Sequence, residues 1–108
     1  MRVFKSPKFQ KKAEKLLSKT GLDELDKFVE DLKKGHIVGK PLSYDFFREK
    51  KIGDKRIYFL IYNDIALILL VGSSDKKMQQ ETIDEIKFLL PEFKQYAYEL
   101  YNRLNKKN

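Results

Sequence analysis

Five cationic side chains fall within thirteen residues in the segment FREKKIGDKRIYF, at Arg48, Lys50, Lys51, Lys55 and Arg56. Residues 48 and 50 of a strand project from the same face, and Arg56 would enter the paired strand just beyond a Gly53-Asp54 turn. A guanidinium group binds phosphate through paired, charge-assisted hydrogen bonds. The spacing therefore predicts that Arg48, Lys50 and Arg56 converge on one phosphate group.

The same cations allow a second interpretation. Charged side chains on an edge hairpin prevent its strands from pairing with strands of other molecules. Lys51 and Lys55 suit this solvated role better than the other three, because alternation along the strand turns Lys51 away from the expected phosphate. The single histidine, His36, follows a glycine after a helical pattern and is interpreted as an exposed loop residue.

Length and composition indicate one domain. The chain has 108 residues, of which 42% are hydrophobic, enough for a single core. We expect that domain to span residues 1–108, with a core over residues 1–90 and a C-terminal helical extension over residues 91–106. The absence of cysteine excludes disulfides, and one histidine gives no basis for a metal site, so no metal or cofactor is expected.

Charge and hydropathy bear on partners and location. The net charge of +7 indicates a polyanionic partner, such as nucleic acid or an acidic protein. The longest apolar stretch is interrupted by Asn63 and Asp64, and the first residues lack the apolar run of a signal peptide. We therefore expect a cytoplasmic protein without a membrane segment.

Periodic apolar residues predict an N-terminal pair of helices. Serine followed by proline at residues 6–7 is typical of a helix start. Apolar residues then recur at spacings of three and four between lysines, as in one buried helical stripe. A second helix is expected from Thr20 or Leu22, and the two together form a helical hairpin over residues 8–34.

The remaining pattern predicts a sheet followed by helices. Strands are expected at residues 46–52, 56–62 and 65–72, and the continuous apolar run of the last one indicates a central position. Residues 3–5 could add an edge strand. A third helix, capped by Ser74 or Asp75, should end or reset at Pro91 before a fourth. The fold class is α+β, a helical hairpin packed on a small antiparallel sheet with one or more C-terminal helices.

The order of these elements, with the segments GKPL, F-R-x-K, IGDKRIYFLIY and VGSSDKK, resembles the RelE/ParE superfamily of type II toxins. The resemblance covers most of residues 1–90. It implies an mRNA interferase that cleaves mRNA at the ribosomal A site without a metal. It also implies an acidic antitoxin protein as the cognate partner.

The resemblance assigns roles to particular residues. Arg48 and Lys50 fall on the basic strand positions, where a lysine helps to deprotonate the ribose 2′-OH and arginine holds the phosphate. Arg56 follows the turn and would stabilise the charge that grows on phosphorus. Ser74 stands where active relatives carry an arginine and would contact the phosphate. The lysines expected to bind RNA are Lys40, Lys51, Lys55, Lys76 and Lys77.

Two departures keep an alternative open. The chain has Ser73-Ser74 where active relatives have an arginine, and Gln80 or a neighbour where they have a tyrosine. Lys76 or Lys77 could replace the missing proton donor, but only their proximity in the sequence supports that role. The alternative is a ParE-like gyrase inhibitor, or a catalytically inactive relative that acts as a protein-binding module.

Overall fold

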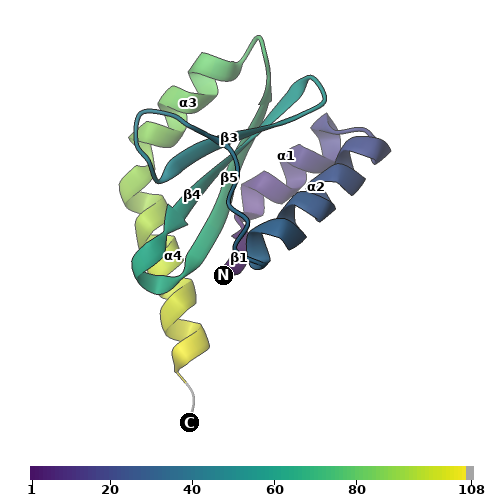
Figure 1. Cartoon of the computed structure of the whole chain (residues 1–108). Coiled ribbons are helices and arrows are strands. Elements are labelled where there is room, and N and C mark those ends of the chain that lie inside the picture. Colours follow the sequence, from purple (N-terminus) through teal and green to yellow (C-terminus); the bar gives the residue numbers. More distant parts are fainter. Residues whose placement is uncertain (107–108) are drawn as a thin grey trace.

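The computed structural model describes residues 1–106 (Figure 1), so the last two residues of the expected domain, 107–108, lie outside the described part. The chain forms a strand and two helices, then four further strands and two more helices. In order they are β1 (Arg2–Lys5), α1 (Pro7–Leu16), α2 (Lys19–Lys33), β2 (Lys40–Pro41), β3 (Phe47–Ile52), β4 (Lys55–Tyr62), the short 3-10 helix η1 (Asn63–Ile65), β5 (Leu67–Asp75), α3 (Gln79–Phe88) and α4 (Leu90–Asn105).

Serine caps begin both N-terminal helices. The Ser6 hydroxyl accepts a hydrogen bond from the Phe9 amide at 3.2 Å, and Pro7 occupies the first turn, where its missing N–H costs nothing. The Ser18 hydroxyl accepts from the Gly21 amide at 3.1 Å and starts α2 at Lys19, slightly before the expected position. The two predicted helices are therefore confirmed, with their break at residues 17–18.

Five strands form one mixed sheet in the order β1-β5-β4-β3-β2. β3, β4 and β5 make the predicted antiparallel meander, and β1 adds the predicted edge strand, in parallel with β5. The expected interior position of the apolar strand is confirmed, because β5 lies between β1 and β4. β2 was not predicted, since two residues that include a proline carry no strand pattern.

β5 is longer than its apolar run. It continues through Ser73 and Ser74 to Asp75, so Ser74 belongs to the sheet and the expectation that it caps a helix is wrong. The alternative cap is closer to the structure, because the Asp75 carboxylate accepts from the Met78 amide at 2.9 Å just before α3 begins. Pro91 stands in the first turn of α4 and resets the helix direction as expected.

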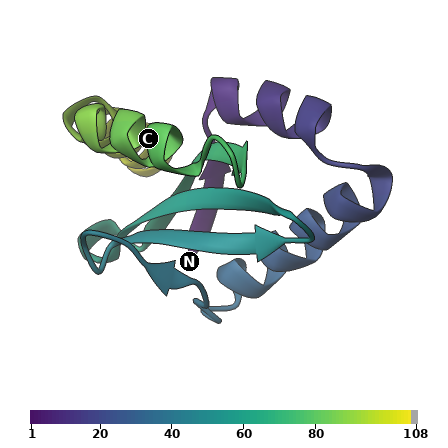
Figure 2. The same ribbon diagram turned by 90° about the horizontal axis from the view of Figure 1, so that it is seen from above.

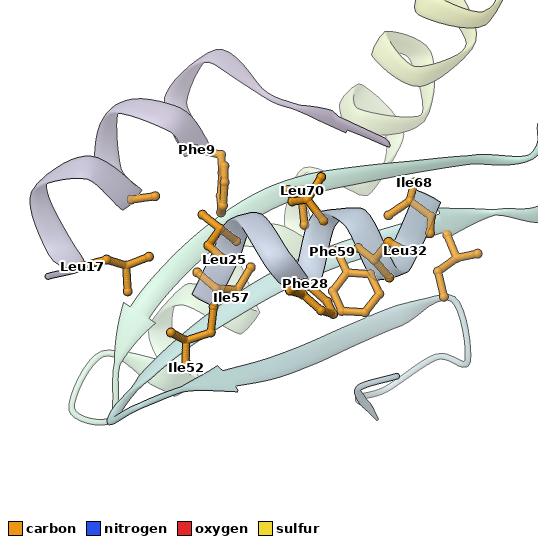
Figure 3. Packing of buried hydrophobic residues seen from close by; sticks show 13 residues of the cluster. Phe9, Leu17, Leu25, Phe28, Leu32, Ile52, Ile57, Phe59, Ile68 and Leu70 are labelled. Atoms are coloured by element: carbon orange, nitrogen blue, oxygen red, sulfur yellow. The ribbon is translucent and has the colours of Figure 1, made fainter. Parts of the chain in front are cut away.

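The two faces of the sheet carry separate cores. α1 and α2 cover one face, and α3 and α4 cover the other (Figure 2). In the first core the ring of Phe28 from α2 meets Phe59 from β4 edge to face, with centroids 5.4 Å apart (Figure 3). In the second, Ile83 and Ile86 of α3 and Ala97 of α4 pack on the opposite side chains of the same strands. Alternate residues of β3 and β4 therefore face opposite cores.

Candidate active site

The β3–β4 hairpin sets which cations can meet. Its two-residue Gly53-Asp54 turn pairs Lys51 with Arg56, and Lys50 with Ile57. Residues directly opposite in an antiparallel pair project from the same face. Arg56 therefore shares a face with Lys51, while Lys50 lies on the other face. The expected convergence of Arg48, Lys50 and Arg56 on one phosphate is wrong, because the strand register places Arg56 on the face opposite to the other two side chains.

The face that carries Arg48 and Lys50 is the one covered by α1 and α2. Arg48 donates from Nε to the Asp45 carbonyl oxygen at 2.9 Å and pairs through Nη2 with the Asp45 carboxylate at 3.1 Å. Lys50 places its ammonium group 5.7 Å from the ring centroid of Phe28 in α2. Both side chains are half-buried and directed to neighbours within the fold.

The face covered by α3 holds a buried ion pair. The Arg56 Nε atom lies 3.3 Å from Glu49 Oε2, and both residues are less than a tenth exposed. The Arg56 Nε atom makes no hydrogen bond, so its contact with the carboxylate is one of charge. Gln79, the first residue of α3, donates from Nε2 to Glu49 Oε1 at 2.9 Å. The carboxylate is thus held between a cation and an amide from two different elements.

A pair of hydroxyl groups completes this cluster. Tyr58 Oη and Ser74 Oγ lie 2.9 Å apart, and both residues are buried. Ser74 is opposite Arg56 in the β4–β5 register, so it belongs to the same face as the ion pair. Burial raises the pKa of Tyr58, and the hydrogen bond with Ser74 offsets part of that rise. The Glu49 charge raises this pKa further, and the Arg56 charge lowers it. The phenol is therefore protonated at neutral pH and can donate a hydrogen bond.

The lysines expected to bind RNA are dispersed. Lys51 is exposed directly opposite Arg56, and Lys55 pairs with Asp54 across 3.4 Å beside the turn. Lys40 lies exposed on the edge strand β2, opposite Glu49. Lys76 and Lys77 are exposed between β5 and α3. By the strand register, Lys40 and Lys51 share the face of the buried pair, whereas Lys55, opposite Ile52, lies on the other face. The RNA-binding role of all five lysines remains a prediction.

Glu49, Tyr58 and Gln79 are the members of this site that the sequence analysis did not single out. A signal for two of them was available. A two-residue turn at Gly53-Asp54 fixes the pairing of β3 with β4, and counting from it places Glu49 and Tyr58 on the face of Arg56. Gln79 carries no such signal, because its position depends on how α3 packs across the sheet.

Two further findings concern metal sites and membrane-spanning helices. Within residues 1–106, no group of three or more histidine, cysteine, aspartate or glutamate side chains is arranged to hold a metal ion. Among the same residues, no helix is both long enough and apolar enough to cross a membrane. The site itself presents a carboxylate, a guanidinium, an amide and two hydroxyls, with the Lys51 ammonium group beside them.

Comparison with known proteins identifies the fold. No family model and no curated protein sequence matches the chain. Among solved structures, the free Escherichia coli toxin RelE, a double arginine-to-alanine mutant, superposes with a TM-score of 0.60 at 15% identity, over 79% of this chain and 96% of that one. The same toxin bound to a peptide of the antitoxin RelB gives a TM-score of 0.56 at 15% identity, over 74% and 90%.

A copper-bound mutant of a toxin from Helicobacter pylori gives a TM-score of 0.52 at 18% identity, over 71% of this chain and 96% of that one. All three superpositions span nearly the whole length of the solved proteins. The chain therefore has the fold of the RelE toxins, which confirms the fold that the sequence resemblance implied.

Proposed function

We propose that this protein is the toxin of a type II toxin–antitoxin system and that it acts as an endoribonuclease on mRNA. The fold is that of RelE toxins, one of which is known in complex with an antitoxin peptide. The single observation that carries the enzymatic part is the buried Glu49–Arg56 pair, with Lys51 exposed directly beside it.

The pair suits cleavage by internal transesterification. Glu49 accepts the proton of a ribose 2′-OH, and the 2′-oxygen then attacks the adjacent phosphorus. The bond from phosphorus to the 5′-oxygen breaks, which leaves a 2′,3′-cyclic phosphate, and the departing oxygen takes a proton from water. Arg56 stabilises the negative charge that grows on the phosphorane, and Lys51 contacts the incoming phosphate from solvent.

This assignment replaces the roles first expected for the hairpin cations. Lys50 cannot act with Arg56 on one phosphate, since the two lie on opposite faces. Ser74 remains close to the reacting groups through its position opposite Arg56. Glu49 is nearly covered by Gln79, so substrate must replace the Gln79–Glu49 hydrogen bond for the carboxylate to reach a 2′-OH.

The test uses isosteric variants on both faces of the hairpin. Glu49→Gln keeps the shape of the side chain and its amide contacts but removes the base, and should slow cleavage about a hundredfold or more. Lys50→Gln is the matched control on the other face and should leave the rate within about twofold. Growth arrest on induction and mapping of mRNA 5′ ends report the activity. Full cleavage by Glu49→Gln would exclude it as the base.

A second candidate function is a non-cleaving toxin, directed at DNA gyrase or acting only through its antitoxin. It is favoured by the observation that both hairpin arginines already pair with carboxylates, Arg48 with Asp45 and Arg56 with Glu49. Growth arrest with intact mRNA and disturbed DNA supercoiling would select this function. Absence of toxicity in every strain background would indicate a catalytically inactive relative that acts only through its antitoxin.

The proposed partner is an acidic antitoxin. A chain with a net charge of +7 attracts an acidic protein, and such an interface weakens with salt. Isothermal titration of the purified pair at low and high ionic strength measures this dependence. An affinity that did not change with salt would show that charge plays no part in recognition of the antitoxin.

A further inference from the structure

A cavity of about 550 Å³ opens at the end of β4 that is remote from Arg56. It lies where the start of α4 meets the connection between β4 and β5 (Figure 1). Tyr62, the last residue of β4, lines this cavity and is about 20 Å from Arg56 along the strand, at 3.3 Å per residue. The cavity is therefore separate from the proposed cleavage site.

Aromatic rings form the walls of the cavity. Phe46 comes from the segment before β3, Tyr62 from β4 and Tyr98 from α4. The Tyr62 and Tyr98 rings meet edge to face, with centroids 6.3 Å apart, and Leu90 and Pro91 at the start of α4 add aliphatic surface. Tyr62 is only 9% exposed, and burial raises the pKa of its hydroxyl, as in an apolar site that water enters poorly. Such a lining favours a planar aromatic group as the occupant.

Two opposite charges lie at the mouth of the cavity. The Asp64 carboxylate accepts a hydrogen bond from the Tyr98 hydroxyl through Oδ2, and this bond does not involve Oδ1. The Lys94 ammonium group lies 5.9 Å from the centroid of the Tyr98 ring. Within residues 1–106, neither Asp64 nor Lys94 takes part in an ion pair. Both side chains are exposed, so each can contact a ligand that enters the cavity.

We propose that this cavity binds a free aromatic amino acid, with its ring between the aromatic walls, its α-carboxylate on Lys94 and its α-ammonium group on Asp64. The two charges of opposite sign select this class of ligand. An anionic ligand would be repelled by Asp64 and a cationic ligand by Lys94, whereas a ligand that carries both charges is attracted by both side chains. A volume of about 550 Å³ is typical of small-molecule sites and accommodates two fused rings.

The experiment uses the fluorescence of L-tryptophan as the probe. The chain contains no tryptophan, so emission excited where tyrosine does not absorb comes from the ligand alone. Titration with the purified protein should give a dissociation constant of about 0.5 mM or less, as expected for a ligand of this size. Three analogues separate the contacts. Tryptamine lacks the carboxylate, indole-3-propionate lacks the ammonium group, and N-acetyltryptophanamide lacks both charges.

Two variants remove one charge each from the mouth of the cavity. Lys94→Gln should weaken L-tryptophan binding about tenfold but leave tryptamine binding within about twofold, because tryptamine has no carboxylate. Asp64→Asn should weaken L-tryptophan binding by a similar factor but leave indole-3-propionate binding unchanged. The matched controls are Lys87→Gln and Glu92→Gln, which are exposed outside the cavity lining and should bind like the wild type. Circular dichroism checks that all four variants fold.

A second measurement follows stability, because the lining comes from both α4 and the sheet. Saturating L-tryptophan should raise the melting temperature of the wild type, since the ligand binds only the folded protein. Equal affinity for L-tryptophan and N-acetyltryptophanamide would overturn the proposal, because the cavity would then suit an aromatic side chain of a partner protein. Equal losses in Lys94→Gln and Lys87→Gln, or no binding at the solubility limit of the ligand, would also overturn it.

Discussion

The two faces of the β3–β4 hairpin differ in how far their charged side chains are buried. On the face toward α2, Arg48 and Lys50 keep part of their surface in water, and Arg48 pairs with an Asp45 side chain that is 90% exposed. On the face toward α3, Arg56 and Glu49 are buried together. Exposed pairs contribute little to stability, whereas a buried charge without its partner is strongly destabilising. The second face is where a single substitution has the largest consequence.

The largest effect is expected for Arg56→Ala. The substitution leaves the Glu49 carboxylate buried without its cation, which should lower the free energy of unfolding by about 3 to 5 kcal/mol. Urea denaturation at neutral pH measures the loss. The double variant Glu49→Gln/Arg56→Gln removes both charges and should recover a large part of the stability. If the double variant were as unstable as Arg56→Ala, shape and not charge would explain the loss.

The next largest effect is expected at high pH, which should lower the free energy of unfolding. Burial raises the pKa of both Tyr58 and Tyr62 in the folded state, so folding favours their neutral forms. Their contribution is fully present below the unfolded pKa of about 10 and is lost as pH rises above it, by at most about 1.4 kcal/mol per pH unit for each group.

Urea titrations from pH 8 to pH 11 follow this loss. The double variant Tyr58→Phe/Tyr62→Phe should show a flatter decline above pH 10, whatever its stability at pH 8. A decline as steep as that of the wild type would place the titrating groups elsewhere.

A smaller effect is expected for Gln79→Ala. It removes the hydrogen bond from the Gln79 amide to the Glu49 carboxylate and should cost about 1 to 2 kcal/mol. If substrate has to replace this bond, the variant should also open the carboxylate to RNA and lower KM without lowering kcat. Gln80→Ala, one residue further along α3 with an exposed side chain, is the control for helix propensity. A drop in kcat would instead indicate that Gln79 orients the base.

The smallest effect is expected on the α2 face. Arg48→Gln breaks the pair with Asp45 and should change stability by about 1 kcal/mol or less, because that carboxylate remains in water. Thermal unfolding with and without 0.5 M salt measures the change. A loss as large as that of Arg56→Ala would erase the difference between the two faces.

The sequence predicted the helices and strands better than it predicted how they pack against one another. Helix caps at Ser6 and apolar spacing along α1 and α2 are local signals, and so is the apolar run that placed β5 inside the sheet. The full length of β5 was missed because Ser73 and Ser74 are polar, although both are buried. Local polarity does not reveal that a neighbouring helix covers a residue.

The site was missed for a related reason. Arg56 was recognised, but its partner depends on a register that shifts every side chain to the other face when it slips by one residue. In the sequence, Glu49 stands between Arg48 and Lys50 and so belongs to a segment that is basic as a whole. Glu49 becomes a site residue only when α3 is laid across it, and no periodicity in the strand encodes that packing.

The parallel pairing of β1 with β5 bears on how the protein is made. Arg2 lies beside Leu67, and Lys5 beside Leu70, so β1 has no partner until β5 has also been synthesised. Contacts so distant in sequence close slowly, because the entropy of a long loop is lost before they form. α1 and α2 can form early, but the sheet that holds Arg56 against Glu49 is completed only when β5 has been synthesised. Because Gln79 of α3 also contacts Glu49, the buried ion pair reaches its final surroundings only after α3 has been synthesised.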